Sequence, residues 1–344
     1  MQAHAQPVRR PRGFSLIELM VGIVVAMAAV IVVMQVFKVS EGTRRTTTGG
    51  DDAQTVGAIS LTTLQRDLRQ AGQGLSNINV LGCSLVLPSG RTVQNLAPLT
   101  INSTQIPAGD ANTDTLLIAY GSGLGSPDGD RINVQPGGNV YSVATPTAFA
   151  LGDFLVAAPQ TRASPCALNL SAVTVIGAPN VTVGAGTVGV ANGTLYNWGR
   201  TPTIVAYAVR SGRLRACNFQ TQDCTSAAAA NWAEVADGVV SLRALYGIDP
   251  ATPLAGVLTD SNYSQTTPST ACGWARVMAM KLVVVTRSGQ PRDAADAAAS
   301  APTWSAGGTA PITLSGSWQN YRYKTFETTV PLRNLSWQGV LQGC

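Results

Sequence analysis

An uninterrupted apolar run near the N-terminus constrains this chain more than any other feature. The run covers the 24 residues from Phe14 to Phe37, and Glu18 is its only ionisable member. As an α-helix rising about 1.5 Å per residue it would be roughly 36 Å long, enough to cross a hydrocarbon layer about 30 Å thick. Three arginines come directly before it: Arg9, Arg10 and Arg12. By the positive-inside tendency they keep the N-terminus cytoplasmic and send residues from about Lys38 onward across the membrane.

Three simpler interpretations of the run are available. One is a cleavable secretory signal ending at the small residues from Ala26 to Ala28, although nine more largely apolar residues follow them. The second is a buried core helix, for which this length is unusual, and the third is a plain membrane anchor. Because a carboxylate inside a spanning segment costs roughly 2.5–3.5 kcal/mol, Glu18 indicates a function beyond anchoring.

The residues around Glu18 resemble a specific processing signal. A short basic leader ends at Gly13, Phe14 follows, and Glu18 is the fifth residue of the sequence FSLIE. Together with the apolar run, these features are similar to the class III signal of type IV prepilins and pseudopilins. The resemblance implies that a membrane-embedded prepilin peptidase cuts after Gly13, removes residues 1–13 as a leader peptide and methylates the new amine of Phe14.

Cleavage after Gly13 gives the remaining helix two charges that are close together. The ammonium group of Phe14 would lie about one helical turn from the carboxylate of Glu18. Neither charge is well tolerated in lipid unless it is paired. We therefore expect Glu18 of an incoming subunit to pair with the Phe14 amine of a neighbour, so that the helix contacts the major pilin and other minor pilins. An intrachain Phe14–Glu18 pair is the alternative.

Residues 38–76 are predicted to continue the helix on the periplasmic side and to link it to the next domain. An apolar helix face is indicated by residues at spacings of three and four: Leu61, Leu64, Leu68 and Ala71. Gly49-Gly50 lowers helix propensity by roughly 1 kcal/mol per glycine, so a softening or kink is expected there. The helix is expected to run from Phe14 to about Ala71 and to end at Gly72 and Gly74.

From 77 to 344 the pattern changes to short apolar runs of the kind found in a β-rich globular domain. The runs predict strands at 115–120, 153–157, 172–176, 239–246, 278–286 and 321–332, and a hairpin over 202–217 that turns at Ser211-Gly212. Connections are expected at 121–138, 177–194 and 288–316, with 294–301 as a short helical turn or a disordered excursion. The predicted fold class is α+β and pilin-like: a long N-terminal helix, transmembrane in its first half, packed on a C-terminal antiparallel β-sheet domain.

Four later segments narrow the resemblance to one family. They occur in the expected order and are similar to blocks of the PilW family of type IV pilus minor pilins: LQRDLRQAG (64–72), VVSLRALYGID (239–249), WARVMAMKLVVVTRS (274–288) and YRYKTFETTVPLRN (321–334). The resemblance implies a structural subunit that helps to initiate or prime pilus assembly near the pilus tip. It also implies a single-pass inner-membrane protein before assembly and a cell-surface pilus component afterwards.

Two other functions remain open at this point. The PilW family also resembles the J-type minor pseudopilin of type II secretion. A pilus-tip adhesin is the second alternative, and its ligand surface would lie in residues 77–235, where no motif is assigned. A separate adhesin is a further expected partner, beside other pilins, the prepilin peptidase and the inner membrane.

Cysteine usage agrees with export. All six cysteines lie on the predicted periplasmic side, where disulfides form, and their number is even: Cys83, Cys166, Cys217, Cys224, Cys272 and Cys344. Cys217 and Cys224 are close in sequence and are predicted to bridge the loop after the hairpin. Pairing of Cys83 with Cys166 and of Cys272 with Cys344 is a guess among fifteen connectivities, and free cysteines in the core are the alternative.

The composition argues against an enzyme. The single histidine, His4, lies in the predicted leader, which nearly excludes a Ser-His-Asp triad, a Cys-His dyad or a His-ligated metal site in the mature chain. The glycines of 121–125 do not have dinucleotide-loop spacing. Asp128-Gly129-Asp130 lacks the remaining calcium ligands in register and is interpreted as a solvated turn. No cofactor or metal is therefore expected.

Two further partner classes are not supported. The net charge of +5 is carried by 20 Arg and 3 Lys without a basic block beyond the N-terminus, which is too diffuse for nucleic-acid binding. The six tryptophans are scattered, and nothing in their spacing indicates a carbohydrate-binding platform.

Overall fold

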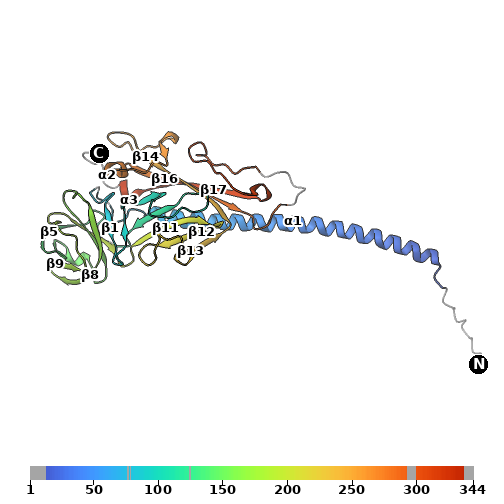
Figure 1. The fold of residues 1–344 in the computed structure, drawn as a ribbon, viewed down its shortest axis with the longest axis horizontal. Coiled ribbons are helices and arrows are strands. Elements are labelled where there is room, and N and C mark those ends of the chain that lie inside the picture. The colour runs from blue at the N-terminus through green and yellow to red at the C-terminus, as the bar shows by residue number, and fades with distance from the viewer. Residues whose placement is uncertain (1–12, 76, 78, 124, 293–299, 337–344) are drawn as a thin grey trace, which may run out of the picture. The chain divides into compact units, whose positions relative to one another are not determined.

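The computed structural model describes residues 13–75, 77, 79–123, 125–292 and 300–336. The chain forms two compact units, the first ending at Gly49 and the second beginning at Gly50. Helix α1, Leu16–Gln70, contributes to both units (Figure 1). Helical backbone continues through Gly49 and Gly50, so the glycines predicted to soften the helix coincide with the unit boundary but do not interrupt α1.

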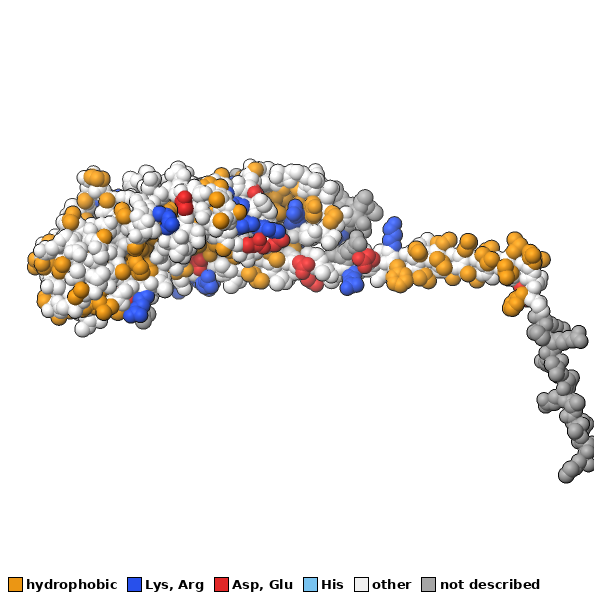
Figure 2. Space-filling model, turned by 60° about the horizontal axis from the view of Figure 1, so that its bottom comes forward, with side chains coloured by type: hydrophobic (Ala, Val, Ile, Leu, Met, Phe, Trp, Pro, Cys, Tyr) orange, Lys and Arg blue, Asp and Glu red, His pale blue; other side chains and the backbone are white. Residues whose placement is uncertain are grey.

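The first unit is the apolar half of α1. Every large apolar side chain from Leu16 to Val39 is exposed, as Figure 2 shows along the face in view. The most apolar 18-residue window of the helix has a mean hydropathy of 2.9, and none of it is buried. Among the described residues, α1 is the one helix long and apolar enough to cross a membrane. Such a surface requires lipid or packed protein around it.

Helix α1 ends where the sequence predicts. Gly72 and Gly74 adopt φ angles of +84° and +79°, a conformation that glycine accepts at little cost and that stops the helix. The side-chain amide of Asn334 donates to the carbonyls of Gln70 at 3.1 Å and Ala71 at 3.2 Å. The carbonyl of Gln70 also accepts the N–H of Gln73 at 3.1 Å, so the following turn and Asn334, from the far end of the chain, together cap the C-terminal end of α1.

The second unit contains a five-stranded antiparallel sheet of order β13-β12-β11-β4-β3. Its strands are β3 (Leu99–Ile101), β4 (Leu116–Tyr120), β11 (Thr203–Arg210), β12 (Arg213–Asn218) and β13 (Ala233–Asp237). The β11–β12 hairpin turns at Ser211 and Gly212, whose φ angles are +54° and +71°. Two consecutive positive φ angles are typical of the tight turn that matches strand twist.

A four-stranded antiparallel sheet follows, of order β15-β14-β16-β17. Its strands are β14 (Val239–Ile248), β15 (Tyr263–Ser264), β16 (Val277–Arg287) and β17 (Tyr323–Pro331). Short helices flank them: α2 (Ala271–Ala275) and α3 (Arg333–Ser336), with 3-10 turns η3 (Asp260–Asn262) and η4 (Trp318–Asn320). Strand β16 is central and nearly all apolar, as expected for a strand covered on both faces.

Six of the remaining strands form a closed barrel. Strand order is β8-β7-β10-β5-β6-β9, and β9 pairs back onto β8, so six strands complete a ring. They are β5 (Asp130–Gly137), β6 (Val140–Val143), β7 (Phe154–Ala158), β8 (Ala167–Gly177), β9 (Asn180–Val183) and β10 (Thr194–Gly199). A separate apolar cluster, including Tyr141, Leu155 and Leu195, fills the ring. Closure removes exposed strand edges.

Smaller elements complete the unit. Strands β1 (Ser84–Val86) and β2 (Thr92–Val93) extend the barrel sheet, and β1 runs parallel to β8, which makes it an exception in an otherwise antiparallel fold. The 3-10 turns η1 (Pro146–Ala148) and η2 (Ala229–Asn231) lie in connections. In Figure 1 the barrel strands β5, β8 and β9 lie at one end of this unit, away from β17.

All predicted strands are present, and the hairpin turns at the predicted residues. Two predicted connections were wrong: 121–138 contains β5 and 177–194 contains β9. Strand β5 ends in Pro136 and Gly137, two residue types that disfavour sheet. Strand β9 has only four residues, beginning with an asparagine, which gives too short a pattern to recognise. The described part of 288–316 contains neither helix nor strand, as predicted, and most of 294–301 lies outside the described residues.

Two predicted disulfides are confirmed. Cys83 bonds Cys166 and Cys217 bonds Cys224, with Cα–Cα distances of 4.9 and 5.7 Å. Cys272 is also disulfide-bonded, and its expected partner Cys344 lies outside the described residues. No described cysteine is free, so the alternative of free core thiols does not hold for this part of the chain.

Candidate assembly site

The residues predicted for processing and assembly lie at the start of α1. Gly13 and Phe14 precede the helix, and a methyl group added to Gly13 would meet no atom of the described residues within 4 Å. Phe14 is 88% exposed. The structure therefore presents the Gly13–Phe14 peptide bond as an accessible segment directly before a helix.

Glu18 closes the first turn of that helix. Its carboxylate accepts the backbone N–H of Ser15 at 3.2 Å, and the N–H of Leu19 donates to the carbonyl of Ser15 at 3.2 Å. A Glu three residues after a Ser is half of a capping box, in which the acid satisfies an amide that the helix cannot. This capping role of Glu18 was not predicted, although the Ser15-x-x-Glu18 spacing is its sequence signal.

The local role of Glu18 bears on the predicted charge pair. The capped amide belongs to Ser15, the neighbour of Phe14, so the carboxylate already lies at the end of the helix where a processed amine would be. A negative group at this end is also favoured by the helix dipole. The same carboxylate can thus serve its own helix and remain available to a cation placed beside that end.

In the second unit, the remainder of α1 is bound to the sheets through a buried acid. Asp67 is 3% exposed and accepts the hydroxyl of Tyr207 on β11 at 2.6 Å and that of Tyr120 on β4 at 3.2 Å. Arg66 lies 3.2 Å from the same carboxylate, with its own side chain mostly in solvent. A buried carboxylate is costly unless it is hydrogen-bonded, and these tyrosines meet that need.

The hydroxyls of Tyr207 and Tyr120 stay protonated and therefore act as hydrogen-bond donors to Asp67. Burial raises the pKa of Tyr207, and its hydrogen bond to the Asp67 carboxylate raises it further. Burial is also the main cause of the raised pKa of Tyr120. Both hydroxyls therefore keep their protons at any ordinary pH, and the bonds from β4 and β11 to α1 do not depend on pH through the tyrosines.

The four-stranded sheet holds α1 at three further points. The hydroxyl of Thr286 donates to the carbonyl of Ala53 at 2.8 Å, and the side-chain amide of Gln65 donates to the hydroxyl of Thr328 at 2.7 Å. Between them, a methyl group on Gly57 would overlap the ring of Phe326. Glycine is therefore needed at position 57 for the close approach of helix and sheet.

We expect Asp67→Ala to lower the free energy of unfolding by about 2–4 kcal/mol, because two buried tyrosine hydroxyls lose their acceptor. Tyr207→Phe, which removes one donor, should cost about 1 kcal/mol. Arg66→Ala is the matched control: its side chain is 68% exposed and should matter by less than about 0.5 kcal/mol. Denaturant unfolding of the detergent-solubilised full chain measures all three. Equal effects of Asp67→Ala and Arg66→Ala would contradict the role of Asp67.

The other candidate sequences have structural roles. A methyl group on Gly121 would lie 2.8 Å from the Cα atom of Trp198, so this glycine allows two backbones to approach. Gly129 turns with a φ of +71°, and the flanking Asp130 accepts the hydroxyl of Thr145. Within the described ranges, no group of three or more His, Cys, Asp or Glu side chains is arranged to hold a metal ion.

Two family models match this chain, one over the start of α1 and one over the C-terminal part of the second unit. A model of the prokaryotic N-terminal methylation motif matches residues 8–34, and a model of type IV pilus-assembly protein W, PilW, matches residues 205–334. Among solved structures, the type IV-like pilin TTHA1219 from Thermus thermophilus is similar at 11% identity, covering 83% of this chain and 96% of that chain with a TM-score of 0.34. Comparison with curated proteins gives no match.

The methylation motif on a long apolar helix, followed by a sheet domain bound to its second half, defines a type IV pilin-like protein. The match of residues 205–334 to the PilW model supports a type IV pilus minor pilin within that class. The PilW match extends from within β11 to α3, and so includes most of the residues named above that hold α1, although not Tyr120: Tyr207, Thr286, Phe326, Thr328 and Asn334.

Proposed function

We propose that this chain is a minor pilin that helps to initiate assembly of a type IV pilus and is placed near the pilus tip. The observation that carries the proposal is the combination, on one helix, of a processing signal, an exposed apolar surface and a firm attachment to a large sheet unit. An apolar helix of this kind is suited to pack among the helices of other pilins after it leaves the lipid.

The size of the second unit favours the tip. Residues 50–344 form one compact unit that includes a complete six-stranded barrel beside two further sheets. This length is about twice that of an ordinary domain. So large a unit packs poorly into a shaft of closely repeated subunits, whereas a tip has free space around it. The expected partners are therefore other minor pilins and the major pilin through α1.

The first test concerns processing. We expect the protein extracted from membranes to begin at a methylated Phe14, because the accessible segment at Gly13 precedes the methylation-motif helix. Gly13→Val should leave the chain uncut, and since an added Cβ atom at Gly13 would meet no described atom within 4 Å, the variant should fold normally. Intact-mass analysis of both proteins measures the cleavage. A wild-type chain that begins at Met1, or near Val30, would contradict the proposal.

The second test separates the two roles of Glu18. Glu18→Val removes both the Ser15 cap and the charge, whereas Glu18→Gln keeps an acceptor for Ser15 and removes only the charge. If the carboxylate pairs with a neighbour's Phe14 amine, both variants should enter pili about tenfold less well, since one lost ion pair in lipid is worth at least about 1.4 kcal/mol. Met20→Val, which changes a nearby exposed apolar side chain, is the control.

These variants are expressed in a strain that lacks the native gene, and the protein in sheared pili is compared with the protein in membranes. Wild-type incorporation of Glu18→Gln would show that the cap, and not the charge, is what matters. The same deletion strain tests the function itself. Loss of surface pili supports priming. Normal pili with lost attachment would instead assign an adhesin, and lost release of exoproteins a type II secretion pseudopilin.

A further inference from the structure

A polar cavity of about 500 Å³ lies in the second unit between the five-stranded and the four-stranded sheet, the two open sheets of the fold. Its walls come from the loop before β4, the tip of the β11–β12 hairpin, the end of β16 and the segment from 313 to 323. The volume is within the range of small-molecule sites. None of the residues considered for assembly lines it, so the cavity is separate from the assembly site.

One wall of the cavity is aromatic and consists of Trp318, Tyr321 and Tyr323. The indoles of Trp198, Trp232 and Trp304 each donate to a backbone carbonyl inside the fold. By contrast, the half-buried Trp318 makes no indole hydrogen bond to any residue that the structure describes. The hydroxyl of Tyr323 donates to the carbonyl of Trp318 at 2.9 Å and so fixes the segment that carries this indole.

The charged groups of the cavity are one acid, Asp110, and one guanidinium, Arg287. Each carboxylate oxygen of Asp110 accepts one backbone N–H of the hairpin tip, Ser211 and Gly212, at 2.8 Å, which leaves further acceptor capacity. Arg287 lies over the ring of Tyr321 at 4.4 Å from its centroid. Its guanidinium makes no hydrogen bond or ion pair within the described part of the chain, although its charge lowers the pKa of Asp237, whose main partner is Arg213.

We propose that this cavity binds a neutral saccharide unit. A sugar ring has an apolar face of C–H groups that suits an aromatic wall, and its hydroxyls both donate and accept. Asp110 accepts from hydroxyls, Arg287 donates to them, and the serines at 315 and 317 can do either. An apolar ligand fits this lining poorly. A strongly anionic ligand would meet the carboxylate of Asp110 in the cavity and that of Asp237 beside Arg287.

This proposal goes beyond assembly, because it gives the minor pilin a ligand site. Saturation-transfer NMR on the full chain tests it, with the methyl glycosides of glucose, galactose, mannose and N-acetylglucosamine as neutral probes and glucuronate as the charged one. A zwitterionic detergent is required, because maltoside detergents carry the probe chemistry. We expect transfer to at least one neutral sugar and about a tenfold loss of affinity in Trp318→Ala and in Arg287→Gln.

Two controls keep the test specific. Trp318→Phe retains an aromatic face and should keep most of the binding, while Arg131→Gln removes an exposed arginine on β5 and should change nothing. Unfolding curves must show that each variant is folded. Absence of transfer to every neutral sugar, transfer only to glucuronate, or transfer unchanged in Trp318→Ala would each overturn the proposal. Pili of the Trp318→Ala strain are examined separately. Normal pili would show that the assembly function does not depend on this cavity, whether or not the cavity binds a sugar.

Discussion

Replacing Cys83 and Cys166 together by alanine is expected to lower the free energy of unfolding by about 4–5 kcal/mol, the largest effect of any pair in the described chain. The two residues are separated by 83 positions, and the entropy that a bridge removes from the unfolded chain grows with the length of the closed loop. The bridge also joins two segments that meet in the fold, since Cys83 precedes β1 and Cys166 precedes β8, and these strands pair in parallel.

The Cys217–Cys224 pair provides the matched control. Both of its cysteines are buried, but only seven positions separate them, so the same chain-entropy argument gives about 2 kcal/mol. Denaturant unfolding of the detergent-solubilised full chain, followed by tryptophan fluorescence, compares the two double variants. If the short-loop variant lost as much stability as the long-loop variant, the effect would come from local packing and not from loop closure.

Local sequence signals predicted the parts of the fold that depend on neighbours in the chain. Ser211-Gly212 lies between two alternating runs, and the turn forms there because few residues tolerate positive φ. The glycines at 72 and 74 end α1 for the same reason. The bridge between Cys217 and Cys224 follows from proximity in sequence. In each case the information that fixes the structure lies within about ten residues.

The barrel could not be predicted in this way. Strand β5 pairs with β10 and β6, and β9 pairs with both β6 and β8. The ring therefore depends on residues as far apart in sequence as Asp130 and Leu195. Short strands with Pro, Gly and Asn give no periodic signal of their own, and their sheet positions follow from the partners that cover them. The ring is therefore a tertiary property that the Gly-rich sequence conceals.

The candidate assembly site also has some residues that local sequence signals predict and others that only tertiary contacts reveal. Gly13, Phe14 and Glu18 can be predicted as site residues because the processing signal is a contiguous motif. Asp67 is not singled out by any sequence motif, yet it is buried against Tyr120 and Tyr207. A helical acid looks the same in sequence whether solvent or a tyrosine hydroxyl faces it. Asp67 attaches α1 to the sheet only because two strands distant in sequence, β4 and β11, bring their tyrosines to it.

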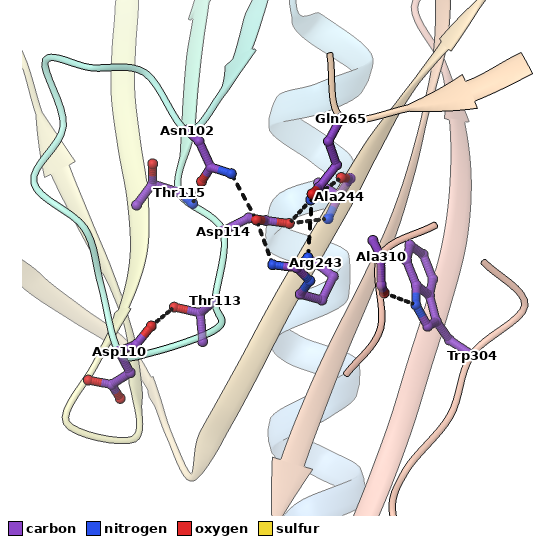
Figure 3. A network of polar contacts seen from close by, with 10 residues as sticks. All are labelled: Asn102, Asp110, Thr113, Asp114, Thr115, Arg243, Ala244, Gln265, Trp304 and Ala310. Carbon is purple, nitrogen blue, oxygen red and sulfur yellow. Dashed lines mark hydrogen bonds and ion pairs between the residues drawn. The ribbon is translucent and has the colours of Figure 1, made fainter. Parts of the chain in front are cut away.

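A second buried acid connects the two open sheets. Asp114 precedes β4 of the five-stranded sheet, and its side chain is 2% exposed. One carboxylate oxygen accepts from Arg243 on β14 at 2.8 Å and from Asn102 at 2.9 Å, and the other accepts from the backbone of Ala244 at 2.9 Å and from Gln265 at 2.7 Å (Figure 3). The carboxylate is thus surrounded by donors from both sheets.

Asp114→Ala is expected to cost about 3–5 kcal/mol, because it leaves the guanidinium of Arg243, whose side chain is 13% exposed, without its counter-charge. The Nε atom of Arg243 has no partner among the described residues, and one terminal nitrogen makes only a long bond of 3.4 Å to Gln265. Asp114 is thus the one acid in the described chain that pairs with this cation. Asp128→Ala removes an exposed acid from a turn and should change stability by less than about 0.5 kcal/mol.

The double variant Asp114→Ala/Arg243→Met distinguishes an unpaired charge from a simple loss of packing. Removing the cation as well should restore part of the loss, since a buried ion pair replaced by apolar side chains is often close to neutral. A double-mutant cycle in the detergent-solubilised full chain, with Arg243→Met as the second single variant, measures this coupling. We expect the double variant to be more stable than Asp114→Ala alone. Additive losses would mean that Asp114 acts through its neutral partners, Asn102, Ala244 and Gln265, and that the connection between the sheets does not depend on charge.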